Sequence, residues 1–424
     1  MALPTIPQPA PTVGKSDWFV HDRFGLFVHW GIYSAAARHE WVKNREEIPD
    51  AVYQRYFDHF DPDLYDPKEW ARAAKEAGMR YVVVTTKHHD GFCLFDSKLT
   101  DYKATNTPAR RDLIAPLVEA FRAEGLRIGF YYSLIDWHHP EFPIDGLHPQ
   151  RNDLAYRDAN RDRDIRKYAE YLHGQVRELL TNYGKIDILW YDVAWPLDAA
   201  GWESGKMNNM VFQLQPDIIV NNRIKLPGDF STPEQRIVAE ADKDWESCMT
   251  MNDSWGYHKA DDNWKPPRTC LRNLITCARL GGNYLLNIGP MADGSVPVES
   301  ARILTTMGAW LGRNSESIYQ AEPCQVSRSN YISFTRRGHT LYAHVHYWPG
   351  PVVTIGGLRN KVLGAKLLAT GAPVRFEQDE FRVRFTGLPA APPDTPITTI
   401  AVDCDGEPRQ DMDHIRVDRP RLKV

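Results

Sequence analysis

Carboxylates follow apolar runs in this sequence at positions where they could act as nucleophiles, acids or bases. Asp192 comes directly after Leu189-Trp190-Tyr191, so its carboxylate has aromatic neighbours. Glu234 and Glu246 follow 42 and 54 residues later (234 − 192 and 246 − 192). Cleavage of a glycosidic bond needs two carboxyl groups that flank the bond. The pattern predicts Asp192 as a nucleophile or base, with Glu234 or Glu246 as the second carboxyl group.

Histidines follow two other apolar runs, at His29 and at His88-His89-Asp90. Adjacent residues at a strand end point to opposite faces, so two neighbouring histidines rarely bind one ion together. No third nitrogen or sulfur ligand stands at a suitable spacing. We therefore expect no metal and no other cofactor. Neutral histidines that donate to sugar hydroxyls fit better, and a structural role for one of the three is the alternative.

Tryptophan is frequent, with 13 residues in the chain. The flat face of a Trp ring can stack on the apolar face of a pyranose, while polar neighbours bind its hydroxyls. One such Trp is usually a core residue, but several in loop-like contexts suggest a sugar site. Five tryptophans flank polar residues in this way: Trp41, Trp137, Trp195, Trp245 and Trp255.

Helical segments alternate with buried strands from about residue 18 to residue 322. In one unit, Asp66-Pro67 begins a helix that ends at Gly78, and an apolar, β-branched strand follows at residues 81–85. Alternating helices and parallel strands leave two folds, a doubly wound sheet and a (β/α)8 barrel. Six strands are predicted, at residues 26–28, 81–85, 128–132, 186–191, 218–220 and 284–286.

Polar clusters at the ends of these strands favour the barrel. All strands of a barrel end at one mouth, so the clusters would form a single site. A doubly wound sheet usually carries a glycine-rich phosphate turn, and neither G-x-G-x-x-G nor G-x-x-x-x-G-K-[ST] occurs. We predict an α/β fold, a (β/α)8-like TIM barrel with two strands hidden in irregular segments. The clusters begin at His29, Lys87, Asp136, Asp192, Asn221 and Asn287.

The sequence changes character from about residue 326, where only short strands and turns remain. The runs 341–346 and 381–385 alternate with period two, and Pro and Gly punctuate them. This pattern predicts a small antiparallel β-sandwich. The predicted organisation is an N-terminal extension (1–17), a barrel (18–322), a β-sandwich (323–406) and a polar tail (407–424).

The composition of the chain argues against nucleic acid and membranes as partners of the protein. The chain has 424 residues, 25% of them charged, and a net charge of −4, so no basic face for nucleic acid is expected. No apolar run is long enough to cross a membrane. The Pro-rich N-terminus lacks the apolar segment of a secretory signal, and six cysteines without a C-x-x-C pair indicate reduced, buried thiols. A cytoplasmic location is favoured over a periplasmic or secreted one, and homo-oligomer formation stays open.

Eight motifs occur in order between residues 18 and 294: HWG (29–31), HEW (39–41), KHHDGF (87–92), LWYD (189–192), NR (222–223), WE (245–246), SWGY (254–257) and GGNYLLN (281–287). As an ordered set they resemble the α-L-fucosidases of glycoside hydrolase family 29. The resemblance covers about two-thirds of the chain. It implies a (β/α)8-like barrel with a C-terminal β-sandwich and the hydrolysis of terminal α-L-fucosyl residues from a fucosylated oligosaccharide or glycoconjugate.

The resemblance also implies residue roles. Asp192 matches the family's nucleophile, which forms a covalent fucosyl-enzyme in a retaining, exo-acting mechanism. Arg223 would lie beside Asp192 and help to keep it ionised. Trp41 and Trp255 would line the apolar side of the sugar. The fucose pocket of the family corresponds to His29, Glu40, Trp41, His88, His89, Tyr131, Arg223 and Trp255.

The acid/base aligns poorly across this family. It lies in a T-x-E loop in some members, which is Glu234 here, and has been assigned to the W-E motif in others, which is Glu246 here. We prefer Glu234, because a carboxylate on a mobile loop explains the weak alignment. Residues 193–196 depart from the family's more usual glycine-containing turn, which leaves the leaving-group subsite and the linkage preference undefined. A related glycosidase, such as an α-L-galactosidase, and a sugar-binding homologue without activity are the alternatives.

Overall fold

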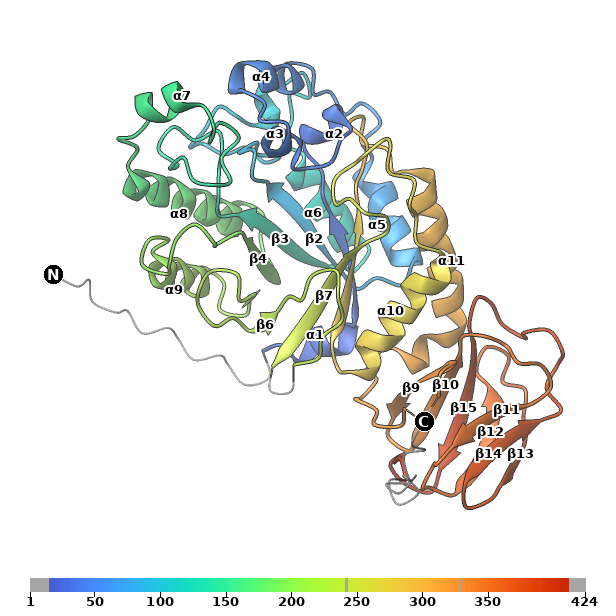
Figure 1. The fold of residues 1–424 in the computed structure, drawn as a ribbon. Helices are drawn as coiled ribbons and strands as arrows, with labels where there is room; N and C mark the ends of the chain where they lie inside the picture. The colour runs from blue at the N-terminus through green and yellow to red at the C-terminus, as the bar shows by residue number, and fades with distance from the viewer. Residues whose placement is uncertain (1–14, 241–242, 328, 412–424) are drawn as a thin grey trace, which may run out of the picture.

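A barrel of helices and parallel strands precedes a smaller β-domain (Figure 1). The computed structural model describes residues 15–240, 243–327 and 329–411. Most of the predicted N-terminal extension and polar tail lies outside these residues. None of the helices in the described part of the chain is long and apolar enough to cross a bilayer.

Eight parallel strands form the barrel sheet, in the order β5-β4-β3-β2-β1-β8-β7-β6. An isolated parallel bridge between Asn221 and Phe230 joins the two edges, so the sheet is nearly closed. The predicted (β/α)8-like fold is confirmed. The strands are β1 (Phe24–Val28), β2 (Tyr81–Lys87), β3 (Arg127–Ser133), β4 (Ile188–Asp192), β5 (Ile219–Val220), β6 (Phe230–Ser231), β7 (Asp244–Thr250) and β8 (Asn283–Ile288).

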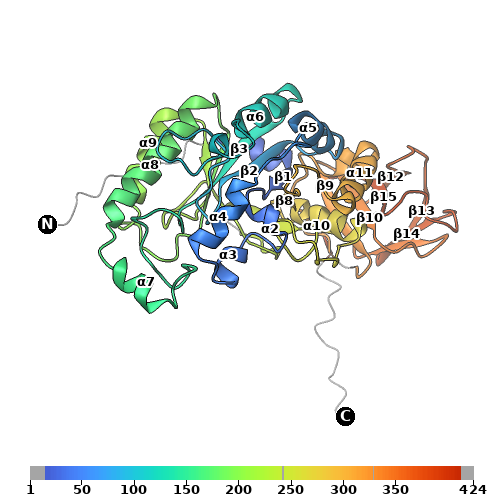
Figure 2. The ribbon, with the colours of Figure 1, turned by 90° about the horizontal axis from the view of Figure 1, so that it is seen from above.

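Helices cover the outside of the sheet and extend over its upper end. Seen from above, α5, α6, α8 and α9 surround the barrel, while α10 and α11 lie between it and the β-domain (Figure 2). No helix occurs in residues 221–229 or 232–240, so β5, β6 and β7 follow one another without the usual crossover helix. The helices are α1 (Asp17–Asp22), α2 (Tyr33–Ala36), α3 (Val42–Arg45), α4 (Asp50–Asp58), α5 (Pro67–Glu76), α6 (Ile114–Ala123), α7 (Leu154–Ala159), α8 (Ile165–Asn182), α9 (Ser204–Leu214), α10 (Pro267–Arg279) and α11 (Val298–Asn314).

The first β/α unit shows how the sequence positions a strand. The Asp66 side chain caps α5 by accepting from two backbone N–H groups, and Pro67 occupies the first turn. Gly78 then adopts φ +87°, a left-handed conformation that ends the helix with little strain. All seven residues of β2 are buried, as its continuous apolar pattern predicts.

Large aromatic side chains fill the inside of the barrel. Phe27, Tyr81, Trp190 and Phe230 belong to one buried cluster within the sheet. Helix α1 closes the lower end, because the Phe19 ring lies 4.8 Å from the Phe230 ring. The barrel is therefore packed from below by α1.

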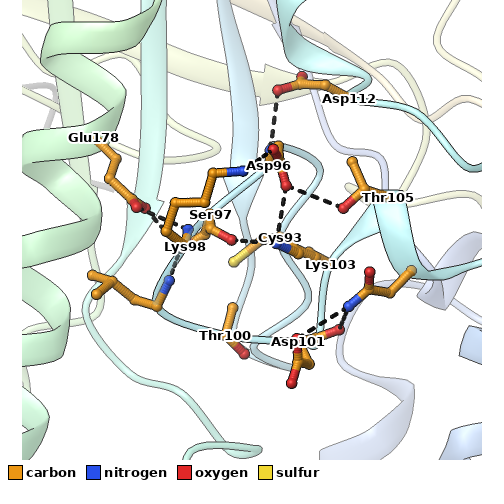
Figure 3. A network of polar contacts seen from close by, with 12 residues as sticks. Cys93, Asp96, Ser97, Lys98, Thr100, Asp101, Lys103, Thr105, Asp112 and Glu178 are labelled. Carbon is orange, nitrogen blue, oxygen red and sulfur yellow. Dashed lines mark hydrogen bonds and ion pairs between the residues drawn. The ribbon is translucent and has the colours of Figure 1, made fainter.

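The loop after β2 is fixed to the body of the barrel by a polar network (Figure 3). The Asp96 carboxylate accepts from Lys103 Nζ at 2.9 Å, and its backbone N–H donates to Asp112 at 3.0 Å. Ser97 Oγ donates to Glu178 on α8 at 2.7 Å. The network thus ties the loop that follows His88-His89 to helix α8.

The C-terminal domain consists of two antiparallel sheets with their own apolar core. It contacts the barrel through α11, where Trp310 Nε1 donates to the Ile397 carbonyl at 2.7 Å and Arg313 pairs with Asp394 at 2.8 Å. This architecture agrees with the predicted β-sandwich. One sheet holds β12 (Val362–Leu367), β15 (Thr398–Cys404), β10 (Thr340–Val345) and β9 (Ile332–Arg337); the other holds β11 (Val353–Gly356), β14 (Arg382–Thr386) and β13 (Arg375–Gln378).

All six cysteines are buried and free, as predicted. Burial raises the pKa of each of these thiols, to about 12 for Cys93 and to about 11 for Cys270. They are therefore inert packing residues at neutral pH.

Candidate active site

A cavity of about 700 Å³ opens at the C-terminal ends of the strands. Strand ends and the loops that follow them supply its walls, as a barrel active site requires. Of the eleven residues predicted for the site, Glu246 alone is absent from the lining. The other ten are His29, Glu40, Trp41, His88, His89, Tyr131, Asp192, Arg223, Glu234 and Trp255.

Asp192 ends β4 and presents its carboxylate to the cavity. Tyr131, on the neighbouring strand β3, donates its hydroxyl to Oδ2 at 2.7 Å. Arg223 Nη1 donates to Oδ1 at 2.7 Å. Burial raises the pKa of Tyr131 well above its usual value, so the phenol remains a donor. Both carboxylate oxygens are thus held in a fixed orientation, one by Tyr131 on β3 and the other by Arg223 in the loop after β5.

Arg223 links two carboxylates that are far apart in the sequence. Its Nη2 donates to Glu234 Oε2 at 2.9 Å while Nη1 contacts Asp192. The guanidinium also lies 4.5 Å from the Trp190 ring centre. Burial alone would lower the pKa of Arg223, but the two carboxylates, Asp192 foremost, outweigh it and raise that pKa. The bridge holds both carboxylates at short range across one side of the cavity.

Glu234 and Glu246 occupy different environments. The Glu234 side chain is 42% exposed and lies at the cavity. Glu246 is fully buried on β7, where its carboxyl group accepts the Tyr81 hydroxyl inside the barrel. The structure therefore brings Glu234 to Asp192 and leaves Glu246 in the core. The sequence alone kept both candidates open.

The buried Glu246 should make the free energy of unfolding depend on pH. Burial raises the pKa of Glu246 from 4.5 to about 7. Between these values the folded protein holds one more proton than the unfolded chain, so this group makes the free energy of unfolding fall as the pH rises. In the wild type this group lowers the free energy of unfolding by about 2–3 kcal/mol between pH 5 and pH 8. In Glu246→Gln this contribution should be absent when the free energy of unfolding is measured by urea titration at the two pH values. Glu240→Gln, at an exposed carboxylate, is the control. An unchanged pH dependence in Glu246→Gln would contradict the assignment.

Three neutral histidines line the cavity. Burial lowers the pKa of His29 to about 4, and lowers the pKa of His88 and His89 well below the usual value. His29 Nδ1 lies 2.7 Å from Asn287 Oδ1, and the Asn287 amide nitrogen donates to the Trp255 carbonyl. Nδ1 of His29 therefore carries the proton, and its Nε2 is an acceptor.

The hydrogen-bond partners of His89 also show which of its ring nitrogens carries the proton. Its Nδ1 lies 2.7 Å from Ser133 Oγ, whose proton is already donated to the Ile135 carbonyl. Nδ1 must therefore donate, and Nε2, 3.8 Å from Asp192, is an unprotonated acceptor rather than half of an ion pair. We expected these histidines to donate to sugar hydroxyls; for His29 and His89 the hydrogen-bond partners reverse that direction at Nε2.

His88 and His89 also point differently from the sequence-based expectation. Their rings lie 3.9 Å apart and both line the cavity, so the prediction of opposite directions was wrong. The period of two applies only within a strand, and β2 ends at Lys87 after a register shift against β3. The chain turns at that point and brings both imidazoles to one side.

Comparison with known proteins shows the family of this chain. A family model described as Alpha-L-fucosidase matches residues 10–316. The chain belongs to the α-L-fucosidase family. It is a glycoside hydrolase with a barrel and a C-terminal β-domain, and the family recognised from the ordered motifs is confirmed.

Similar proteins cover nearly the whole chain. The tissue alpha-L-fucosidase of Homo sapiens is 28% identical over 412 residues, covering 89% of this chain and 85% of that protein. A solved structure of alpha-L-fucosidase isoenzyme 1 from Paenibacillus thiaminolyticus is 44% identical, with a TM-score of 0.88 over 92% of this chain and 99% of the other. A trapped covalent intermediate of a family 29 alpha-L-fucosidase from Bacteroides thetaiotaomicron has 27% identity and a TM-score of 0.81 over 93% and 97%.

Glu40, Trp41 and Trp255 complete the cavity of this enzyme. The Gly256 backbone N–H donates to Glu40 Oε2 at 2.8 Å, and burial raises the pKa of Glu40. The Trp41 ring lies 4.8 Å from the His89 ring, and the Trp255 ring lies 5.1 Å from the His29 ring. The cavity is thus lined by both polar and aromatic side chains.

Two of the five tryptophans expected near a sugar do not reach the cavity. Trp137 is 1% exposed and packs behind Trp41 and His89, at ring distances of 5.3 and 5.5 Å. Trp245 is 2% exposed and packs against Gly282, where a β-carbon would clash with its ring. A polar neighbour in the sequence does not distinguish a tryptophan of the wall from one of the core.

Residues outside the predicted set also line the cavity. Phe27, on β1, contacts His29 at a ring distance of 4.4 Å, and its position two residues before the His-Trp-Gly motif, which puts it on the same side of the strand as His29, was a usable signal. The remaining lining comes largely from residues 253–263, whose charged run carries no strand-end pattern. The residues missed by sequence reasoning include Phe27, His39, Arg45, Trp190, Asp253, His258, Asp261, Asp262 and Asn263.

The backbone after Asp192 is strained. Val193 has φ 55°, a left-handed conformation that a β-branched residue rarely adopts. Glycine would accept this conformation freely, which gives a physical meaning to the departure from a glycine-containing turn. Such strain persists where the surrounding structure enforces it, and it concentrates at functional sites.

Proposed function

We propose that this α-L-fucosidase removes terminal α-L-fucosyl residues by double displacement, with Asp192 as nucleophile and Glu234 as acid/base. One observation carries the assignment: a single guanidinium, that of Arg223, contacts both carboxylates at 2.7 and 2.9 Å within one cavity. Paired carboxylates on opposite sides of the glycosidic bond are what this chemistry needs.

In the first step, an oxygen of Asp192 attacks the anomeric carbon while Glu234 gives its proton to the glycosidic oxygen. The bond from the anomeric carbon to the leaving group breaks, and a fucosyl ester of Asp192 forms. In the second step, Glu234 takes a proton from water as that water attacks the same carbon. The products are fucose with retained configuration, the alcohol and the regenerated enzyme.

The cavity lining supports an L-fucosyl substrate. The unprotonated Nε2 atoms of His29 and His89 accept hydroxyl protons, and Glu40 offers a further acceptor. Phe27 and Trp255 supply an apolar surface for the methyl group that distinguishes fucose from galactose. A hydroxymethyl group there would bury a hydroxyl against apolar rings, which costs about 1–3 kcal/mol when no partner is present.

The experiment compares 4-nitrophenyl α-L-fucoside with 4-nitrophenyl α-L-galactoside, which differ only at that group. We expect kcat/KM for the fucoside to be higher by roughly 10- to 100-fold. The anomer released first, observed by NMR before mutarotation, should be α. Faster hydrolysis of the galactoside, or release of the β anomer first, would overturn the proposal. Fucose binding without turnover would indicate an inactive homologue instead.

A further inference from the structure

A second groove, of about 580 Å³, adjoins the catalytic cavity. The two share Val193, Trp195, Arg223 and Glu234 as lining. The inference that follows rests on the proposed function, in which Glu234 protonates the glycosidic oxygen. The leaving group must then lie beside Glu234, and the groove begins at that residue. The rest of its lining is Ala194, Asn222, Lys225, Thr232, Pro233 and Arg236.

The groove carries an excess of positive charge. Lys225 and Arg236 line it and are exposed. Within residues 15–240, 243–327 and 329–411, neither side chain forms an ion pair or a hydrogen bond. Arg223 is already neutralised by Asp192 and Glu234. Two cations of the groove therefore face solvent without a partner.

Three aspartates of residues 253–263 and one arginine line the catalytic cavity outside the groove. Asp253, Asp261, Asp262 and Arg45 belong to the cavity lining but not to the groove lining. The two unpaired cations, Lys225 and Arg236, belong to the groove lining alone. A leaving group with a negative charge would be favoured beside these cations and disfavoured beside the three aspartates.

Two residues that line the groove have left-handed backbone conformations. Lys225 has φ 61°, and Val193 across the groove has φ 55°. Trp195 is 65% exposed where the groove meets the cavity, although a large aromatic surface is normally buried. An exposed ring beside strained backbone marks a binding surface rather than a core.

We propose that this groove is the leaving-group subsite and that Lys225 and Arg236 select leaving groups that carry a carboxylate or a sulfate. When the leaving group is neutral, both cations stay solvated and form no charge-assisted contact with it. An anionic one makes up to two charge-assisted contacts, each partly screened by water. Selection therefore concerns the group attached to fucose and not fucose itself.

The test uses four aryl α-L-fucosides: 3-carboxyphenyl and 3-sulfophenyl, each with its neutral amide counterpart. The readout is the ratio of kcat/KM for an anion to that for its amide. The Lys225→Gln/Arg236→Gln double variant gives the reference ratio, which removes intrinsic differences in leaving-group reactivity. We expect the wild-type ratio to exceed this reference by roughly three- to tenfold at low salt and to approach it in 0.5 M NaCl. The 3-sulfophenyl group, a sulfonate, stands in for a sulfate, and the larger of the two ratios identifies the preferred anion.

Lys259→Gln is the matched control, because Lys259 is an exposed cation that lines neither cavity. It should keep the wild-type ratio of kcat/KM for each anion to that for its amide. Equal ratios in the wild type and the double variant would overturn this inference. Absence of fucose release from all four substrates would instead contradict the proposed function, so the two failures are distinguishable.

Discussion

Asp192→Ala should lower kcat for 4-nitrophenyl α-L-fucoside by at least roughly 10³-fold, because it removes the proposed nucleophile. The remaining carboxylate on Arg223, that of Glu234, is the proposed acid/base and would have to act in both roles. The measurement is nitrophenol release under saturating substrate. Asp217→Ala is the control, since Asp217 is exposed just before β5, at the opposite end of the barrel from the cavity.

Chemical trapping separates loss of the nucleophile from loss of folding. A 2-fluoro-fucosyl fluoride should label the wild type once, on the peptide that contains Asp192, as seen by mass spectrometry. Asp192→Ala should keep its far-ultraviolet circular dichroism and take up no label. Activity within tenfold of the wild type, or a label on another peptide, would show that Asp192 is not the nucleophile.

Glu234→Ala should discriminate strongly between leaving groups. An alkyl α-L-fucoside needs protonation of its oxygen, so its kcat/KM should fall by roughly 10²–10⁴-fold. A 2,4-dinitrophenyl fucoside leaves without that proton, so its kcat/KM should fall less than tenfold. Added azide, which needs no general base, should react with the fucosyl-enzyme and yield a fucosyl azide of retained configuration.

Glu246→Gln is the comparison that decides between the two candidate acids. Glu246 is buried beside Tyr81 within the barrel and cannot reach the glycosidic oxygen. Its replacement should affect the alkyl and dinitrophenyl substrates equally, and azide should have no effect. A loss confined to the alkyl substrate in Glu246→Gln, with equal losses in Glu234→Ala, would exchange the two roles.

The fold was largely predictable because the β/α unit repeats locally. A helix with a capped start and a glycine stop, followed by a β-branched strand, can be recognised from about twenty residues, as in α5 and β2. The exceptions were β6 and β7. Strand β6 has two residues, and β7 carries Asp244, Glu246 and Ser247 among its apolar residues, so neither has a continuous apolar run. Their place follows from pairing with neighbouring strands, which depends on residues far away in the sequence.

The sequence alone determined which chemistry was available and where the barrel would present it. Strand-end positions brought Asp192, Tyr131 and the histidines to one mouth, because parallel strands of a barrel end together. Only the tertiary structure shows that Glu234 lies at the cavity and Glu246 in the core. The inward direction of a β7 side chain places Glu246 in the core, whereas the loop after β6 places Glu234 on Arg223. Which side of a strand faces the cavity, and which charges meet there, are properties of the closed barrel and not of any segment.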